Sequence, residues 1–246
     1  MTEQPTSRTP VRPSPLAIYR DFAAFVRRPL LPERTEPFDG HSLGAVGWLL
    51  LLNIAIALPL AVLLTHLAES ASVDTPQFEA LTENGPLFTL ALGALGIPLV
   101  EEIFFRGWIN GRRTSLIVIA IAVVAVVLVG VLLGLQAPAW TRMAAIGAAL
   151  AAILVTWWRG RHHGQAPQWF VRIFPLIYFG QAIAFGLVHL TNYKQPPSAL
   201  LLLFVVPQLV AGLINGYARV RFGMWGNVTI HALSNGLFLS MMLSGL

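Results

Sequence analysis

Two adjacent glutamates, Glu101 and Glu102, stand in the stretch "VEEIFFRG" inside a strongly apolar part of the chain. They are the only carboxylates from residue 84 to the end. On a helix, Glu102 and Arg106 lie on one face, where pairing lowers the cost of burying both charges. Glu101 points about 100° away and has no local partner. A carboxylate held in an apolar site can serve as a general base, so we expect that chemistry at Glu101.

Two histidine motifs lie in later apolar segments. Phe185 and His189 share a helical face in "FGLVH", and His231 and Asn235 do so in "HALSN". An asparagine can orient an imidazole or donate to a developing oxyanion. Each motif also has a purely structural explanation: a histidine bonded to a backbone carbonyl, a polar clamp between helices, or glutamates at the membrane interface. Because ionisable groups in hydrocarbon cost about 2.5–3.5 kcal/mol, we favour a functional reading.

A metal site is one chemistry that these residues could form together. Two histidines and a glutamate make a catalytic zinc ligand set with an open position for water. Glu101, His189 and His231 are therefore candidate ligands for zinc or another divalent metal. The helical HExxH spacing is absent, which excludes the usual metalloprotease arrangement. Metal-bound and metal-free sites both stay open.

The elements that carry these residues must cross a membrane. The 246 residues are 56% hydrophobic and 11% charged, whereas soluble domains carry about 25% charge. We expect an all-α fold, a polytopic transmembrane bundle of about seven helices, with six to eight as the limits. The predicted spans are 43–66, 86–106, 115–135, 143–158, 170–190, 199–218 and 224–244.

The basic residues predict an orientation. Of the 16 Lys and Arg residues, all but Arg142 and Lys194 fall on one side of the predicted spans. By the positive-inside rule the N-terminus is cytoplasmic and the C-terminus is outside, as in a protein of the bacterial inner membrane. Basic residues scattered among loops argue for lipid contact and against nucleic-acid binding. The chain has no cysteine, which excludes disulfides and thiolate metal sites.

Two regions are expected along the chain. Residues 1–40 are a polar, basic, Pro-rich tail without the apolar stretch of a cleavable signal. Within this tail, 16–28 form either a short amphipathic helix on the membrane surface or part of a disordered segment. Residues 41–246 are expected to form a single membrane-embedded domain.

The three motifs resemble, in order, the EExxxR, FxxxH and HxxxN motifs of the CAAX protease and bacteriocin-processing family, also called Abi intramembrane proteases. The resemblance covers 86–113 and 175–240. It implies an intramembrane metalloendopeptidase, similar to CAAX prenyl protease 2, that acts on a membrane-associated peptide or protein. Eukaryotic members remove the C-terminal tripeptide of prenylated CAAX proteins, and bacterial relatives are linked to peptide processing or bacteriocin self-immunity. The first two motifs are widely separated here, so we predict that 115–158 are an inserted helical hairpin.

The resemblance also implies a role for each motif residue. Glu101 would activate the water that attacks the scissile peptide bond, while Glu102 and its arginine partner would hold the site. His189 and His231 would bind metal or polarise water and carbonyl, and Asn235 would help stabilise the tetrahedral oxyanion. The family is usually described as metalloproteases, although a glutamate-activated water without a catalytic metal is also argued.

The depth of His189 sets a condition on a shared site. At about 1.5 Å per helical residue, His189 would lie about 25 Å from Arg172, near the opposite membrane face. Glu101 would lie only about 7–8 Å from Arg106, at the basic side. A shared site therefore requires the fifth segment to begin deeper, to tilt strongly, or to break at Pro175.

Two other function classes fit the same residues. A proton-coupled transporter could use them as a relay, but the inverted repeats that would favour it are absent from the sequence. A non-catalytic scaffold or immunity protein would have no use for buried charges. We therefore expect an endopeptidase. Nothing in the sequence reports a prenyl group, a cleavage site or an oligomeric state.

Overall fold

The computed structural model describes residues 14–71, 73, 82–83, 85–160, 165–193 and 198–244. These residues form helices and no strand, which confirms the all-α class. In chain order the elements are α1 (Pro15–Arg27), α2 (Gly40–Ala71), α4 (Pro86–Leu90), the π-helical turn η1 (Ala91–Gly96), α5 (Ile97–Arg106), α6 (Arg113–Gly134), α7 (Ala139–Gly160), α8 (Gln168–Val188), the 3₁₀ turn η2 (His189–Asn192), α9 (Ala199–Phe204) and α10 (Val206–Ser244).

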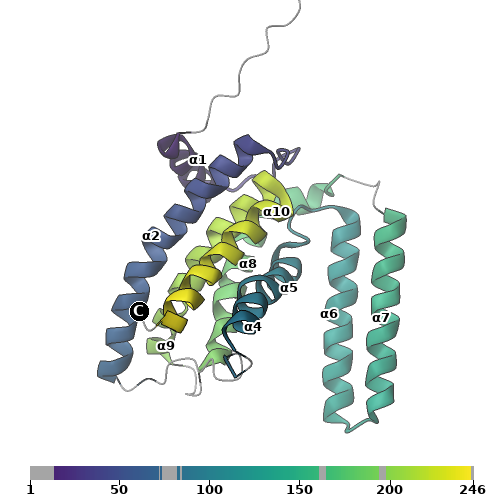
Figure 1. Ribbon diagram of the computed structural model, residues 1–246. Helices are drawn as coiled ribbons and strands as arrows, with labels where there is room; N and C mark the ends of the chain where they lie inside the picture. The colour runs from purple at the N-terminus through teal and green to yellow at the C-terminus, as the bar shows by residue number, and fades with distance from the viewer. Residues whose placement is uncertain are drawn as a thin grey trace, which may run out of the picture.

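All seven predicted spans are helical, but the last two belong to one element. Among the described residues, six helical stretches are long and apolar enough to cross a membrane, and the last of them is 199–244. Its main helix, α10, breaks at Gly223, whose φ of 82° is a conformation that glycine adopts readily. Figure 1 shows the yellow second arm (224–244) running back beside the yellow-green first arm (206–222). The break therefore turns α10 into a helical hairpin.

The tail and the fourth span differ from the sequence prediction in detail. The fourth span, predicted as 143–158, is the longer helix α7, Ala139–Gly160. Of the two alternatives for the tail, the helix is found: α1 covers Pro15–Arg27, and the Ser14 hydroxyl caps its first turn. Residues 1–13 lie outside the described part of the chain.

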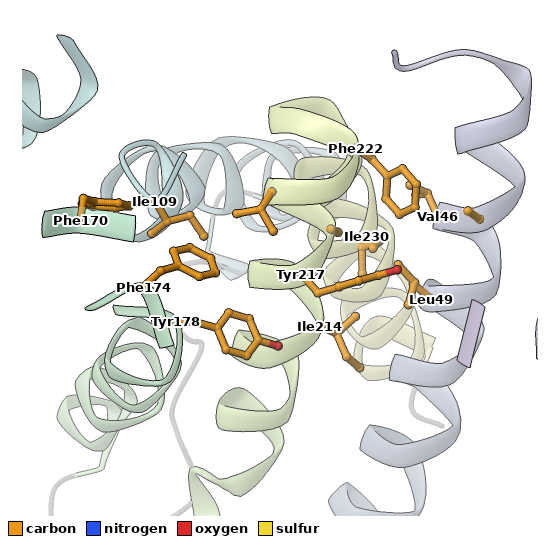
Figure 2. Close-up of a cluster of buried hydrophobic side chains, with 13 residues drawn as sticks. Val46, Leu49, Ile109, Phe170, Phe174, Tyr178, Ile214, Tyr217, Phe222 and Ile230 are labelled. Atoms are coloured by element: carbon orange, nitrogen blue, oxygen red, sulfur yellow. The ribbon is translucent and has the colours of Figure 1, made fainter. Parts of the chain in front are cut away.

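An aromatic core joins α1 to the bundle. Phe25 of α1 packs edge to face on Phe174 and Tyr178 of α8 and on Tyr217 of α10, with ring centroids 5.0–6.3 Å apart. Figure 2 shows Phe174 and Tyr178 on the α8 side of α10, and Tyr217 extending from α10 toward Leu49. Such aromatic pairs contribute about 0.5–1.5 kcal/mol each beyond their buried area. The apolar face of α1 therefore packs against protein and is partly buried.

The helices α6 and α7 form a separate antiparallel hairpin beside the bundle (Figure 1). The Thr114 hydroxyl donates to the Gly160 carbonyl at 2.8 Å and ties its two ends together. Neither helix buries any part of its most apolar stretch. Trp140 and Trp157 are exposed near opposite ends of α7, about 26 Å apart along the helix, close to the thickness of the hydrocarbon layer. The hairpin predicted at 115–158 is thus present and faces outward on nearly all sides.

The connections fall at two ends of the bundle. In Figure 1, α1, the end of α5 and the break in α10 lie at the upper end, while the α6–α7 turn and the C-terminus lie toward the lower end. The N-terminal helix and the end of α10 therefore lie at opposite ends of the bundle. The glutamates, which α5 carries, lie between these two ends.

Candidate active site

The helix α5 presents its two glutamates to different surroundings. Pro98 lies where η1 runs into α5 without a break, so its missing N–H removes one helical hydrogen bond there. The buried face repeats every four residues from Pro98 through Glu102 to Arg106. The Glu102 side chain is fully buried, as predicted for the partner of Arg106. Glu101 lies one residue round the helix and keeps 24% of its side chain exposed. The two acids are therefore separated in environment as well as in direction.

Glu102 accepts hydrogen bonds from three buried side chains. The guanidinium of Arg106 and the side-chain amide of Asn227 each donate to one of its oxygens. The third donor is Nδ1 of His231, which lies 2.7 Å from Oε1. A carboxylate paired with a guanidinium accepts hydrogen bonds and does not donate them. The His231 ring proton is therefore assigned to Nδ1, and Glu102 holds the ring in this orientation.

His231 stands between the two glutamates. Its Nε2 lies 3.5 Å from Oε2 of Glu101, on the opposite side of the ring from Glu102. With the proton on Nδ1, Nε2 carries a lone pair, so it and the Glu101 carboxylate are both acceptors. A molecule that donates two hydrogen bonds, such as water, complements this pair. The arrangement can therefore orient a water molecule beside a carboxylate.

Arg106 is enclosed on every side. Its Nε donates to Gln181 Oε1 at 3.1 Å, and its guanidinium carbon lies 4.3 Å from the centre of the Phe185 ring. Arg219 donates to the backbone carbonyls of Arg106 and Gly107 at 2.9 and 3.0 Å, which caps the end of α5. Both side chains are 0% exposed, so protein groups alone surround the Glu102–Arg106 pair.

The contact of Arg106 with Gln181 relates the level of His189 to that of Glu101. Arg106 lies level with Gln181 of α8, nine residues after Arg172. From there His189 is about 12 Å further along α8, and Glu101 is about 7–8 Å further in the same direction along α5. The proposed break at Pro175 does not occur, because α8 continues through that residue. The sequence estimate measured the two residues from different arginines, whereas this contact places both on one scale.

His189 is the first residue of η2. The Phe185 ring separates it from His231, the histidine that contacts both glutamates. Nδ1 of His189 is 2.7 Å from the Phe185 carbonyl, which only accepts, so Nδ1 carries the proton. The Phe185 ring packs against both imidazoles, with centroid distances of 4.7 Å to His189 and 5.7 Å to His231. Within the described residues, His189 makes no hydrogen bond or ion pair with either glutamate. Of the two histidines that were predicted to face Glu101, His231 does so and His189 does not.

The predicted zinc ligands do not converge as a metal site. The chemistry of Glu101, His189 and His231 suits zinc, since each could offer an unprotonated oxygen or nitrogen. However, among the residues that the structure describes, no three His, Asp or Glu side chains lie close enough together to hold a metal ion. A zinc or other divalent metal stays a prediction, and no reaction step below is assigned to it.

Asn235 contacts the π-helical turn. Its Nδ2 donates to the Gly93 carbonyl at 3.2 Å, in the centre of η1. A π-turn widens the helix and redirects its carbonyls, and such turns are frequent at functional sites. The amide nitrogen has a second N–H, which can serve another acceptor. Asn235 thus belongs to the same region as the glutamates, although it bonds to neither of them.

Comparison with protein families matches residues 83–237 to the type II CAAX prenyl endopeptidase Rce1-like family. The chain belongs to this family. The match spans every motif residue described above, so the resemblance drawn from the three motifs is confirmed. Searches of the curated proteins and of the solved structures each found no significant match. Family membership and the apolar helices together identify an integral membrane protein and a CAAX-type intramembrane protease.

Three supporting residues of this CAAX-type protease were missed from the sequence. Asn227 carries a usable signal, because it precedes His231 by four residues and shares its helical face. Gln181 is an isolated amide in an apolar helix, which marks a buried hydrogen bond but not its partner. Arg219 was counted only as a topology charge, although its side chain is almost fully buried.

Proposed function

We propose that the chain is an intramembrane endopeptidase in which Glu101 activates a water molecule to hydrolyse a peptide bond. The observation that supports this proposal is the position of His231, held by buried Glu102 on one side and facing partly exposed Glu101 on the other. One carboxylate is committed to structure, and the other can exchange a proton with water and substrate. General-base catalysis needs such a carboxylate, one that is free to take up and release a proton.

The reaction proceeds by direct attack of water. Glu101 takes a proton from the water as its oxygen bonds to the carbonyl carbon of the scissile peptide, and the carbonyl oxygen becomes an oxyanion. Glu101 then gives the proton to the amide nitrogen, the carbon–nitrogen bond breaks, and a carboxylic acid and an amine are released. His231 Nε2 accepts the second hydrogen bond of the attacking water and directs its lone pair toward the carbonyl.

The remaining motif residues serve the substrate. We assign the second N–H of Asn235 to the oxyanion, a position where one donor contributes about 2.7–4 kcal/mol to catalysis. His189 offers an acceptor at Nε2, which suits a substrate peptide N–H. Phe185 and Arg106 hold the other site residues in place. The Phe185 ring packs on both imidazoles, and the Arg106 guanidinium neutralises Glu102.

The substrate proposed is a CAAX-type C-terminus on a membrane-associated protein, with a bacteriocin or leader peptide as the second candidate. The family description carries this proposal. The test is cleavage by purified protein in lipid vesicles, using a farnesylated CAAX peptide, the same peptide without the lipid, and a leader peptide. Release of the tripeptide from the farnesylated peptide supports the proposal. Proton flux across the vesicles without cleavage of any peptide would instead favour the transporter.

The orientation proposed places the N-terminus in the cytoplasm of a bacterial inner membrane. The chain lacks cysteine, so single cysteines report accessibility without background. We expect a Ser14→Cys protein to resist a membrane-impermeant maleimide added outside the cell, and a Ser70→Cys protein to react with it. The reverse pattern would invert the proposed topology.

A further inference from the structure

A second pocket lies between α1 and the end of the first arm of α10. Its volume is about 390 Å³. Asp21 and Phe25 line it from α1, Arg28, Leu30 and Leu31 from the residues that follow α1, and Tyr217 and Arg221 from α10. None of these residues takes part in the proposed reaction, and the pocket lies at the end of the bundle where α1 packs (Figure 1).

The pocket contains one guanidinium without a counter-ion in the described structure. Arg221 is 3.6 Å from Asp21 and 3.1 Å from Glu36, so two carboxylates face its single charge. Arg28, by contrast, forms no ion pair with any described residue. Its backbone N–H caps the C-terminal end of α1, and its side chain is exposed. The pocket therefore has an exposed guanidinium at its edge that an anion can meet.

The pocket also has apolar walls, which suit a ligand with an apolar part as well as a negative charge. Leu30 is 60% exposed at its edge, and the Phe25 ring lines it from within. An exposed leucine beside an arginine fits a ligand with a charged head and an apolar body. Arg20, Arg27 and Arg34 are sequence neighbours of the lining residues and add positive charge beside the pocket.

We propose that this pocket binds the headgroup of an anionic phospholipid. The phosphate meets Arg28, with Arg221 beside it, and the glycerol and first methylenes lie on Phe25 and Leu30. Each basic residue near an anionic membrane surface contributes about 1 kcal/mol of attraction, which a shaped pocket makes specific. The bound lipid ties α1 to the turn of α10, where the Glu36 N–H already donates to the Arg221 carbonyl at 2.8 Å.

The test compares melting temperatures of the full chain in bilayer discs of phosphatidylcholine and in discs that also contain phosphatidylglycerol. We expect phosphatidylglycerol to raise the melting temperature in a saturable manner for the wild type and for Arg27→Ala. The rise should fall by more than half in Arg28→Ala. Arg27 is the matched control, because it neighbours Arg28 on α1 and does not line the pocket.

Three outcomes would overturn the proposal: no effect of phosphatidylglycerol on the wild type, equal loss in Arg27→Ala and Arg28→Ala, or an equal rise from inorganic phosphate in phosphatidylcholine discs. The second would indicate general surface attraction, and the third a soluble anion. If Arg28→Ala does not fold, Leu30→Gln replaces it. This change alters only an exposed side chain at the pocket edge and should also halve the rise, whereas an unchanged rise would contradict the proposed lipid contact.

Discussion

The side chains of Glu101 and Glu102 differ in surroundings because one residue of helical rotation separates them. Glu102 turns into the bundle, where a guanidinium, an amide and an imidazole converge on it. Glu101 faces Nε2 of His231, and 24% of its side chain stays exposed. A single histidine thus contacts a fully buried carboxylate and a partly exposed one. Exchanging the two environments would require rebuilding α5.

Asn227 offers a test of the Glu102 anchor. An Asn227→Ala change removes one donor to a buried carboxylate, for which we expect a loss of about 1–3 kcal/mol in stability and a fall in kcat with little change in KM. The fall follows because Glu102 would no longer hold His231 in one orientation. Melting curves and steady-state cleavage rates measure both effects.

Asn53→Ala is the matched control for this change. Asn53 is also buried and donates to the Ser234 hydroxyl at 2.9 Å, but it touches neither glutamate. It should lose comparable stability and keep its kcat. An equal fall of kcat in both variants would show that the Asn227 effect is only structural.

The local contacts of the site could be predicted from sequence, and the distant ones could not. The Glu102–Arg106 pair follows from helical spacing alone. The contact between His231 and Glu102 joins residues 129 apart, and no spacing rule covers that distance. The motifs indicated which residues belong together, but the choice of Glu102 as the anchor of His231 came only with the packing of α5 on α10.

The helices α8 and α10 approach each other closely. At Gly212 of α10, a methyl group would lie 2.9 Å from the Cα of Ala182 on α8, so only glycine fits. The approach lets Gln181 donate to the Gly212 carbonyl at 3.1 Å while its oxygen accepts from Arg106. The α8–α10 contact therefore supports the arginine that neutralises Glu102.

We expect Gly212→Ala to separate α8 from α10 and to destabilise the protein by about 1–3 kcal/mol, the usual effect of overpacking. Gly180→Ala, on the same pair of helices, is the control because nothing lies within 4 Å of its added methyl. That change should be neutral or stabilising by up to about 1 kcal/mol, as alanine favours helix. Equal thermal stability of the two variants would refute the close contact.

Hydropathy predicted the spans but not their depth or breaks. The span 86–106 matches the combined extent of α4, η1 and α5, because apolar length alone defines it. The π-turn at η1 has no comparable signal in composition. A basic residue next to a basic loop is usually exposed, whereas Arg106 is fully buried in contact with Glu102, Gln181 and Phe185.

At the scale of the whole molecule, the α6–α7 hairpin is an outlying part. The chain leaves and re-enters the bundle at neighbouring points, since a Cβ at Gly111 would lie 2.7 Å from that of Ala166. Both helices pack mainly on each other. The bundle that holds the glutamates is thus built from segments on either side of the hairpin.

Excision of residues 113–164 tests whether the hairpin is an insertion. We expect the shortened protein, with Arg112 joined to Gln165, to fold and to keep its cleavage rate within about threefold, because none of the described site residues forms a hydrogen bond, ion pair or ring contact with α6 or α7. Circular dichroism in detergent and peptide cleavage provide the readouts. Loss of helical folding or of cleavage would show that the hairpin belongs to the catalytic bundle.

The most direct measurement of the central claim compares Glu101→Gln with Glu102→Gln for melting temperature and peptide cleavage. Glu101→Gln should reduce cleavage by about 10²–10⁴-fold, the usual contribution of a general base, and leave the melting temperature unchanged. Glu102→Gln should lower stability by about 3–5 kcal/mol as well as cleavage, because Arg106 loses its buried counter-ion. Wild-type cleavage by Glu101→Gln, or a melting temperature that falls for Glu101→Gln and not for Glu102→Gln, would contradict the assigned roles.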